Sequence, residues 1–328
     1  MKEYDIRPKA VFDEFLDISR REAERLFRDK SFFVEIPCPA CDSSRCEHAF
    51  DKYGFTYLTC LGCGSLYLSP RPSYERLDAY YRDSQAVEHW AEVFYKETER
   101  ARRAQIVRPR ALLVKEWAEK LCLRGTFADV GSGFGVLLEE IRDLGMFDRI
   151  VGVEPSAALA EICRGRGFEV VEKKMEEIVP GEIGAVFATN FEVIEHVFNP
   201  YEFLEALGRA LVPGGVVLFT TLVVSGFDLQ ELWSASKSIC PPLHVNLMST
   251  VGIEALLGRC GMEPLELSTP GRLDVDILRN ALAECPGVAV SRFARAVASA
   301  PEATRAAFQA FLQENRLSSH VRVVARVR

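Results

Sequence analysis

The stretch FADVGSGFGVLLEEI, residues 127–141, constrains the fold more than any other part of the sequence. An apolar, strand-like segment leads into three alternating glycines, Gly131, Gly133 and Gly135, and then into a helical pattern. A strand, a glycine loop and a helix start together form a site where backbone N–H groups can approach a ligand closely. The glycines do not follow the G-x-G-x-x-G spacing of dinucleotide-binding loops, and no Gly-Lys-Ser/Thr follows, as a P-loop requires. The stretch therefore predicts an α/β fold that holds a ligand other than NAD or a P-loop nucleotide.

Further strands, helices and turns follow downstream in a fixed order. The segment IVGVEP ends a second apolar strand at an acidic residue, Glu154, and a third strand, FEVV, covers residues 168–171. The stretch AVFATNFEVIEHVFNPYEFLEALGRALVPGGVVLFTT then contains a fourth strand, an E-V-I-E-H segment, a helix and a Pro-Gly-Gly turn into a fifth strand. Across residues 125–225 this order resembles class I S-adenosylmethionine-dependent methyltransferases, in which D-V-G-S-G-F-G is motif I. The resemblance implies a Rossmann-like, seven-stranded sheet with helices on both faces. Its last strand would be an exposed antiparallel one, SHVRVVARVR (319–328).

The resemblance also assigns cofactor-binding roles to individual residues. Asp129 would orient the loop and reach the methionine ammonium, and Glu154 would hold the ribose hydroxyls. Pro155 would lie near the adenine, while Asn190 and Phe191 would line the pocket beside the sulfonium. The loop positions that would bring the backbone close to the amino-acid part of S-adenosylmethionine are Gly131, Ser132 and Gly133.

The chain departs from the family pattern after the third strand. An Asp that accepts a hydrogen bond from the adenine amino group often stands there in the family, whereas this chain reads EKKMEE with Lys174 near that position. A lysine cannot accept a hydrogen bond. We therefore expect backbone atoms of Met175, or the carboxylate of Glu176, to take that place.

The cysteines indicate a metal site near the N-terminus. Cys38 and Cys41 form one C-x2-C pair, and Cys60 and Cys63 form another after a gap of eighteen residues. Such paired turns aim four thiolates at one ion, and four thiolates complete a tetrahedron, so the spacing predicts a closed, structural zinc ribbon. Free buried thiols or a disulfide pair are the alternative interpretation.

Two histidines are candidates for the general base that an oxygen acceptor needs. His196 follows the fourth strand in E-V-I-E-H, and His244 follows the fifth in ICPPLHVNLMS. Both come after strands whose carboxyl ends should face the ligand crevice. His196 has a second interpretation, in which it only caps or braces the next helix. If neither histidine acts, the carboxylates Glu192 and Glu195 are the next candidates.

Charge and composition narrow the range of partners. The formal net charge of −7 offers no basic stripe for a nucleic-acid backbone, so a nucleic-acid partner is disfavoured. The arginine-rich segment 97–110 spaces its apolar residues at helical intervals and predicts a solvated helix face. No run of eighteen apolar residues occurs, and the start of the chain lacks a signal-peptide pattern. We therefore expect a cytoplasmic protein without a membrane partner.

The appended segments determine which substrate is expected. We expect an N-terminal helical segment (1–34), a zinc ribbon (35–72), a helical linker (73–124) and a methyltransferase domain (125–328) with a substrate-covering insertion at about 226–318. This arrangement is similar to bacterial zinc-ribbon methyltransferases of surface-polysaccharide and deoxysugar pathways, which implies a small, carbohydrate-related acceptor methylated on a hydroxyl. Sugar C-methylation is an alternative that we expect less than O-methylation, because those enzymes have an additional large C-terminal domain that this sequence does not match. A ribosomal-RNA methyltransferase that grips RNA with its ribbon is a further alternative.

Overall fold

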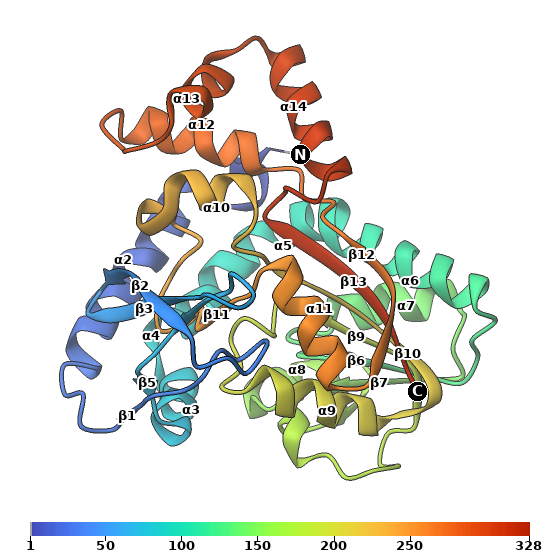
Figure 1. The fold of residues 1–328 in the computed structure, drawn as a ribbon. Helices are drawn as coiled ribbons and strands as arrows, with labels where there is room; N and C mark the ends of the chain where they lie inside the picture. The colour runs from blue at the N-terminus through green and yellow to red at the C-terminus, as the bar shows by residue number, and fades with distance from the viewer. Residues whose placement is uncertain (1) are drawn as a thin grey trace.

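The computed structural model describes residues 2–328. A seven-stranded sheet in the order β12-β13-β10-β9-β6-β7-β8 forms its centre (Figure 1). Strands β6 to β10 run parallel to one another, and β13 lies antiparallel between β10 and β12. The predicted seven-stranded α/β sheet is thereby confirmed. Its strands are β6 (Thr126–Val130), β7 (Arg149–Val153), β8 (Glu169–Val171), β9 (Ala185–Phe191), β10 (Leu211–Leu222), β12 (Met262–Ser268) and β13 (His320–Val327).

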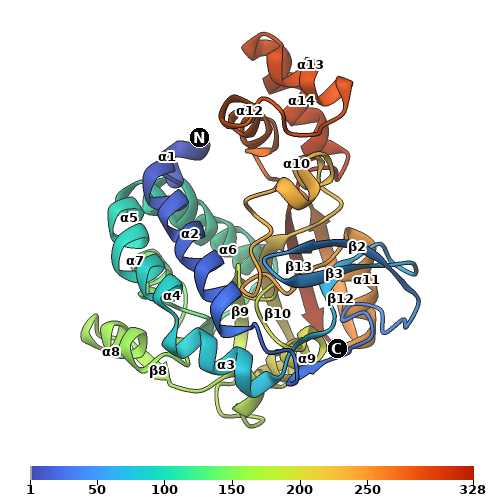
Figure 2. The ribbon, with the colours of Figure 1, turned by 90° about the vertical axis from the view of Figure 1, so that its left-hand side faces the viewer.

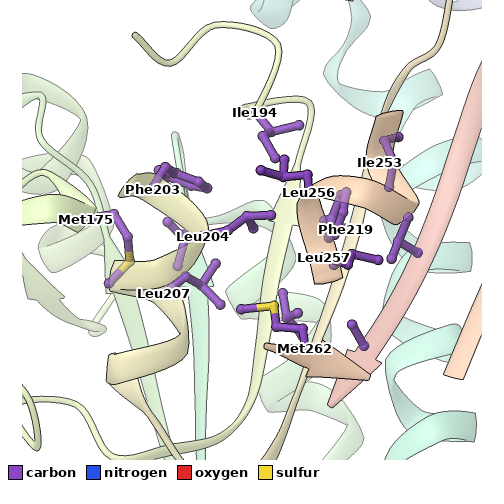
Figure 3. Packing of buried hydrophobic residues seen from close by; sticks show 14 of the residues in the cluster. Met175, Ile194, Phe203, Leu204, Leu207, Phe219, Ile253, Leu256, Leu257 and Met262 are labelled. Carbon is purple, nitrogen blue, oxygen red and sulfur yellow. The ribbon is translucent and has the colours of Figure 1, made fainter. Parts of the chain in front are cut away.

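Helices cover both faces of this sheet because its strands alternate between two apolar cores. Along β10, Val217 and Phe219 belong to one core, and Val216 and Leu218 belong to the other. Figure 3 shows the first core, where leucines of α9 (Pro200–Ala210) and α11 (Thr250–Arg259) meet around Phe219. The second core packs against α6 (Arg108–Lys120) and α7 (Val136–Leu144), and α8 (Ala157–Gly165) connects β7 to β8.

Strand β13 differs from the sequence expectation of an exposed strand. Val321, Val323 and Val324 are fully buried, because β12 covers the outer edge of β13 and the two cores cover its faces. The segment 226–318, predicted as an insertion, is also not a separate unit in the structure. Helix α11 and strand β12 lie within that range and are part of the central layers.

The N-terminal part forms a helical segment and a small sheet. Helices α1 (Glu3–Ile6) and α2 (Lys9–Leu26) precede a four-stranded sheet in the order β11-β4-β3-β2 and a two-stranded pair, β1-β5. Strand β11, which follows β10 in sequence, completes the small sheet by pairing with β4. The strands are β1 (Phe33–Val34), β2 (Cys46–Lys52), β3 (Phe55–Cys60), β4 (Leu66–Leu68), β5 (Arg71–Pro72) and β11 (Asn246–Leu247).

Two further groups of helices complete the molecule. The linker contains α3 (Tyr74–Asp83), α4 (Gln85–His89) and α5 (Lys96–Arg102), and π-helical turns at Trp90–Tyr95 and Arg103–Val107 flank α5. The other group, α10 (Phe227–Leu232), α12 (Asp274–Glu284), α13 (Arg292–Ser299) and α14 (Glu302–Glu314), stands together at one end of the molecule (Figures 1 and 2). None of the helices in residues 2–328 combines the length and apolar character that a bilayer crossing requires.

Candidate active site

The glycine loop between β6 and α7 has a backbone path that glycine makes possible. Gly131, Gly133 and Gly135 have φ angles of +76°, +53° and +74°, in the left-handed region that other L-residues adopt at a cost. Gly131 is also short of space, since a Cβ there would lie 2.7 Å from Cγ2 of Val193. The loop therefore bends sharply at the carboxyl end of β6, where backbone N–H groups are available to a ligand.

Asp129 and Glu154 lie at the ends of adjacent parallel strands, β6 and β7, and both side chains are buried. The Thr189 hydroxyl donates to Asp129 Oδ1 over 2.7 Å. Burial raises the pKa of Asp129 to about 7, against the opposing influence of Thr189 and Arg110. At Glu154, Oε2 accepts from the Gly133 N–H and Oε1 from the Ser156 N–H, each over 2.9 Å.

This geometry makes the Glu154 carboxylate the link between the glycine loop and β7. Burial raises the pKa of Glu154, and the two backbone donors oppose that rise because they stabilise the charged form. Ser132, in the same loop, is buried beside Cys163, whereas Pro155 is exposed at the surface.

Strand β9 contributes a polar atom without a partner at the same edge. Asn190 is fully buried; its Nδ2 lies 3.5 Å from the carbonyl oxygen of Val130, and its Oδ1 has no hydrogen-bond partner in residues 2–328. A buried acceptor without a donor is costly, and a ligand N–H or O–H can remove that cost. Phe191, the next residue, lies half-buried under the guanidinium of Arg110, 4.4 Å from the ring centre.

The Lys174 departure has a structural explanation. The Lys174 ammonium pairs with Asp78 Oδ1 over 2.6 Å and donates to the Tyr74 hydroxyl over 3.0 Å, so it points toward α3. Met175 is buried beside it, and burial raises the pKa of Glu176. The lysine is therefore engaged by the linker helix.

The two predicted histidines meet each other, with a carboxyl group beside them. The rings of His196 and His244 are 4.8 Å apart, and one ligand atom of each lies within 4.8 Å of a Glu195 oxygen. Nδ1 of His196 lies 2.9 Å from the Leu243 carbonyl oxygen, and Nδ1 of His244 lies 2.6 Å from that of Ser238. Because a carbonyl oxygen only accepts, each Nδ1 carries the proton, and each Nε2 is left with a free lone pair.

The protonation of this cluster follows from its burial. Burial, with His196 nearby, lowers the pKa of His244 to about 3, and burial likewise lowers the pKa of His196. Burial and the charge of Glu192 raise the pKa of Glu195 to about 8. Groups this close titrate as a coupled unit, so the cluster gains or loses a proton near pH 8.

A second polar cluster surrounds Glu192, a candidate base from the sequence, and its partners Arg110, Thr220 and His320 were missed from the sequence. Glu192 Oε1 accepts from Arg110 and from the Thr220 hydroxyl, each over 2.5 Å, and lies 2.7 Å from Nε2 of His320. Burial alone would raise the pKa of Glu192, but His320 and Arg110 hold it well below its usual range. The expectation of a solvated helix face at 97–110 is wrong for Arg110, whose side chain is only 18% exposed. The sequence signals that could have indicated this cluster were the carboxylate of Glu192 in E-V-I-E-H and the arginines at helical spacing upstream.

The four cysteines of the two C-x2-C pairs converge as predicted. Their sulfurs lie within 4.8 Å of one another, with 3.6 Å between Cys38 and Cys63 and 3.5 Å between Cys41 and Cys60. A tetrahedral zinc site with Zn–S bonds of about 2.3 Å places its sulfurs about 3.8 Å apart, so these cysteines fit zinc and are too far apart for a disulfide.

The cysteine module shares its core with the large sheet. Cys38, Cys60 and Cys63 belong to the same apolar cluster as Ile253 and Leu256 of α11. Arg259 Nη1 donates to the Ala40 carbonyl over 2.8 Å. The module is thus built against α11 and is not a separate appendage.

Comparisons with known proteins match the chain to methyltransferases. The profile of a family described as a methyltransferase domain matches residues 99–267, just over half of the chain. Ubiquinone biosynthesis O-methyltransferase of Nitrosococcus oceani is 32% identical over 103 residues, 29% of this chain and 42% of the relative. The enzyme of the same name from a Bradyrhizobium species is 34% identical over 108 residues, 31% of this chain and 42% of the relative. The chain thus spans about two fifths of the length of these curated relatives.

Solved methyltransferase structures also resemble the chain at low identity. One example is the O-methyltransferase of a trans-AT polyketide synthase multienzyme of Brevibacillus brevis, in complex with S-adenosyl-L-homocysteine. It is 16% identical, with a TM-score of 0.48, over 71% of this chain and 75% of that one.

Proposed function

The chain belongs to the methyltransferase-domain family, and from that premise we propose that it transfers a methyl group from S-adenosylmethionine to a hydroxyl of a small-molecule acceptor. One observation carries the proposal. In the cluster that can take a proton, Glu195 and His196 follow β9 and His244 follows β10, which pairs with β9. Strand β6, the other neighbour of β9, leads into the glycine loop and Asp129. A methyl acceptor bound at the carboxyl edge of these strands would have both partners of the reaction within reach.

The cofactor roles are assigned to residues that fit them chemically. Asp129 would accept from the methionine ammonium, and Glu154 would accept from the ribose hydroxyls with the lone pairs that its backbone donors leave free. Asn190 Oδ1 supplies a buried acceptor that needs a donor. Met175 and Pro155 are assigned to the adenine end, Gly131, Ser132 and Gly133 to the amino-acid end, and Phe191 to the wall beside the sulfonium.

The protein's own contribution is to position the acceptor and remove its proton. When bound, S-adenosylmethionine supplies an already activated methyl group, so orientation provides much of the barrier reduction, about 7–11 kcal/mol in favourable cases. Nε2 of His244 or of His196 accepts the hydroxyl proton, and Glu195, once it is ionised above its pKa of about 8, stabilises the resulting imidazolium. The low pKa of His244 makes it a weak base alone, which is why Glu195 is included in the assignment.

The acceptor is assigned to the carbohydrate-related class by the combination of ribbon, linker and core. Methylation on oxygen is supported by the relatives, which are named O-methyltransferases. The four-cysteine module is proposed to hold one structural zinc ion, whose closed thiolate set leaves no position for a reactant. The acidic net charge of −7 is the reason for placing RNA methylation second.

Labelled methyl transfer separates these possibilities. The purified full chain is incubated with S-adenosylmethionine carrying a labelled methyl group and with fractions of a cell extract. We expect label in glycan or nucleotide-sugar fractions, whereas label in quinone precursors would change the acceptor class and label in RNA would favour the alternative. Label on carbon in place of oxygen would show C-methylation.

A further inference from the structure

Arg102, the last residue of α5, holds a charge without a counter-ion. Its guanidinium lies 5.9 Å from the ring centres of Trp90, Phe94 and Tyr95, and the side chain is half-buried. Across residues 2–328, no hydrogen bond and no carboxylate within ion-pair distance engages it. Burial, together with the charges of Arg7 and Arg110, lowers the pKa of Arg102 to about 10.

Arg7 is a second guanidinium without a counter-ion, and it lies 5.5 Å from the ring centre of Phe12, which packs on Phe94 beside Arg102. It follows α1, which packs against α5, as Figure 2 shows on the side of the N-terminal helices. Its single side-chain hydrogen bond goes to the Ser238 hydroxyl over 3.5 Å, and the described part of the chain offers it no ion-pair partner. The Asp228 carboxyl does not neutralise it, because burial beside Asp274 raises the pKa of Asp228 well above its usual range.

These two arginines connect the glycine loop with the histidine pair. Tyr95, beside Arg102, stacks on Phe134 of the glycine loop with 4.6 Å between ring centres. Ser238, which accepts from Arg7, also binds Nδ1 of His244 through its carbonyl. Arg102 lies between two π-helical turns, a distortion that is frequent at functional sites.

We propose that Arg7 and Arg102 form an anion subsite for the methyl acceptor, and that the acceptor carries a phosphoryl group. This inference rests on the proposed function and names the chemistry of its substrate. A half-buried guanidinium without a counter-ion is costly, and a bound anion removes that cost. The guanidinium fork matches phosphate and carboxylate oxygens, and two unpaired guanidinium groups favour a group with two negative charges over a single carboxylate.

The test measures anion binding to the full chain saturated with S-adenosylhomocysteine. Inorganic pyrophosphate and, separately, succinate are titrated at constant ionic strength by calorimetry. The variants are Arg102→Gln and Arg7→Gln. Arg100→Gln is the control, because Arg100 is an exposed residue of the same helix and its replacement changes the net charge equally. We expect each site variant to weaken pyrophosphate binding roughly 10- to 100-fold, and the control to leave it unchanged.

The other outcomes refute the inference in distinct ways. An equal loss of pyrophosphate affinity in Arg100→Gln would show unspecific electrostatic attraction. Wild-type protein that does not bind pyrophosphate, or binds succinate more tightly, would exclude a phosphoryl subsite. A tenfold loss of S-adenosylhomocysteine affinity in Arg102→Gln would assign this arginine to the cofactor's own carboxylate. Failure of wild-type protein to bind S-adenosylhomocysteine would instead refute the proposed function. If Arg102→Gln is unfolded by circular dichroism, Arg7→Gln and Arg102→Lys decide the question.

Discussion

Replacing Glu154 by Gln should weaken cofactor binding strongly, because its carboxylate has two tasks. Its two oxygens each accept a backbone N–H over 2.9 Å, from Gly133 in the loop and from Ser156 at the start of α8, and the carboxylate is also the proposed acceptor for the ribose hydroxyls. In Gln, an NH2 group replaces one oxygen and must confront an N–H donor. Hydrogen bonds to a charged group contribute about 1.5–3 kcal/mol. The dissociation constant of S-adenosylmethionine should therefore rise roughly 10- to 100-fold.

Calorimetry with S-adenosylmethionine and S-adenosylhomocysteine measures this effect directly. Glu161→Gln is the matched control, because Glu161 is an exposed residue of α8 and its replacement removes the same charge nearby. Thermal unfolding shows whether both variants remain folded. Equal affinities for wild-type protein and Glu154→Gln would refute the assignment of Glu154 and, with it, the cofactor geometry.

Four further results are expected. Purified protein should contain about one zinc per chain by metal analysis, and Cys60→Ser should lose that zinc. Cys60→Ser should also lower the melting temperature of the whole chain, because the module shares its core with α11; an unchanged melting temperature of the large sheet would show that only the ribbon depends on zinc. Gly131→Ala should destabilise the fold by roughly 1–2 kcal/mol or more in urea unfolding, from the left-handed φ and the contact with Val193. His244→Ala should reduce turnover roughly 10²- to 10⁴-fold with unchanged affinity for S-adenosylhomocysteine, and unreduced turnover would remove it from the proton path. The folded-state pKa of His244 is about 3, below that of the unfolded chain, so stability should fall as the pH drops from about 6.5 toward 3, and His244→Gln should flatten that dependence.

Much of the sheet could be predicted because its signals are local. The glycines of motif I, the acidic end of β7 and the Pro-Gly-Gly turn each depend on short-range backbone geometry, so their order along the chain was sufficient. The two C-x2-C pairs were equally readable, since four thiolates at that spacing have few other uses. Strand β13 was recognised by alternation, but its burial was not, because the covering strand β12 had been assigned to an insertion.

The remaining features depend on contacts between distant segments. The fourth strand of the small sheet, β11, comes from residues 246–247 and pairs with β4, about 180 positions earlier. Arg71 is fully buried and donates to carbonyls of Phe198 and Val245, a role that no local pattern announces. The role of Lys174 at the adenine-side position depends on α3, whose Asp78 pairs with it.

The most direct test of the account is whether the purified protein converts S-adenosylmethionine to S-adenosylhomocysteine when an acceptor is present. Product formation should require a small-molecule fraction of the extract, survive ribonuclease treatment and fall with Glu154→Gln and with His244→Ala, but not with Glu161→Gln. Wild-type protein that binds S-adenosylmethionine and forms no S-adenosylhomocysteine with any small-molecule fraction would contradict the proposed methyl transfer.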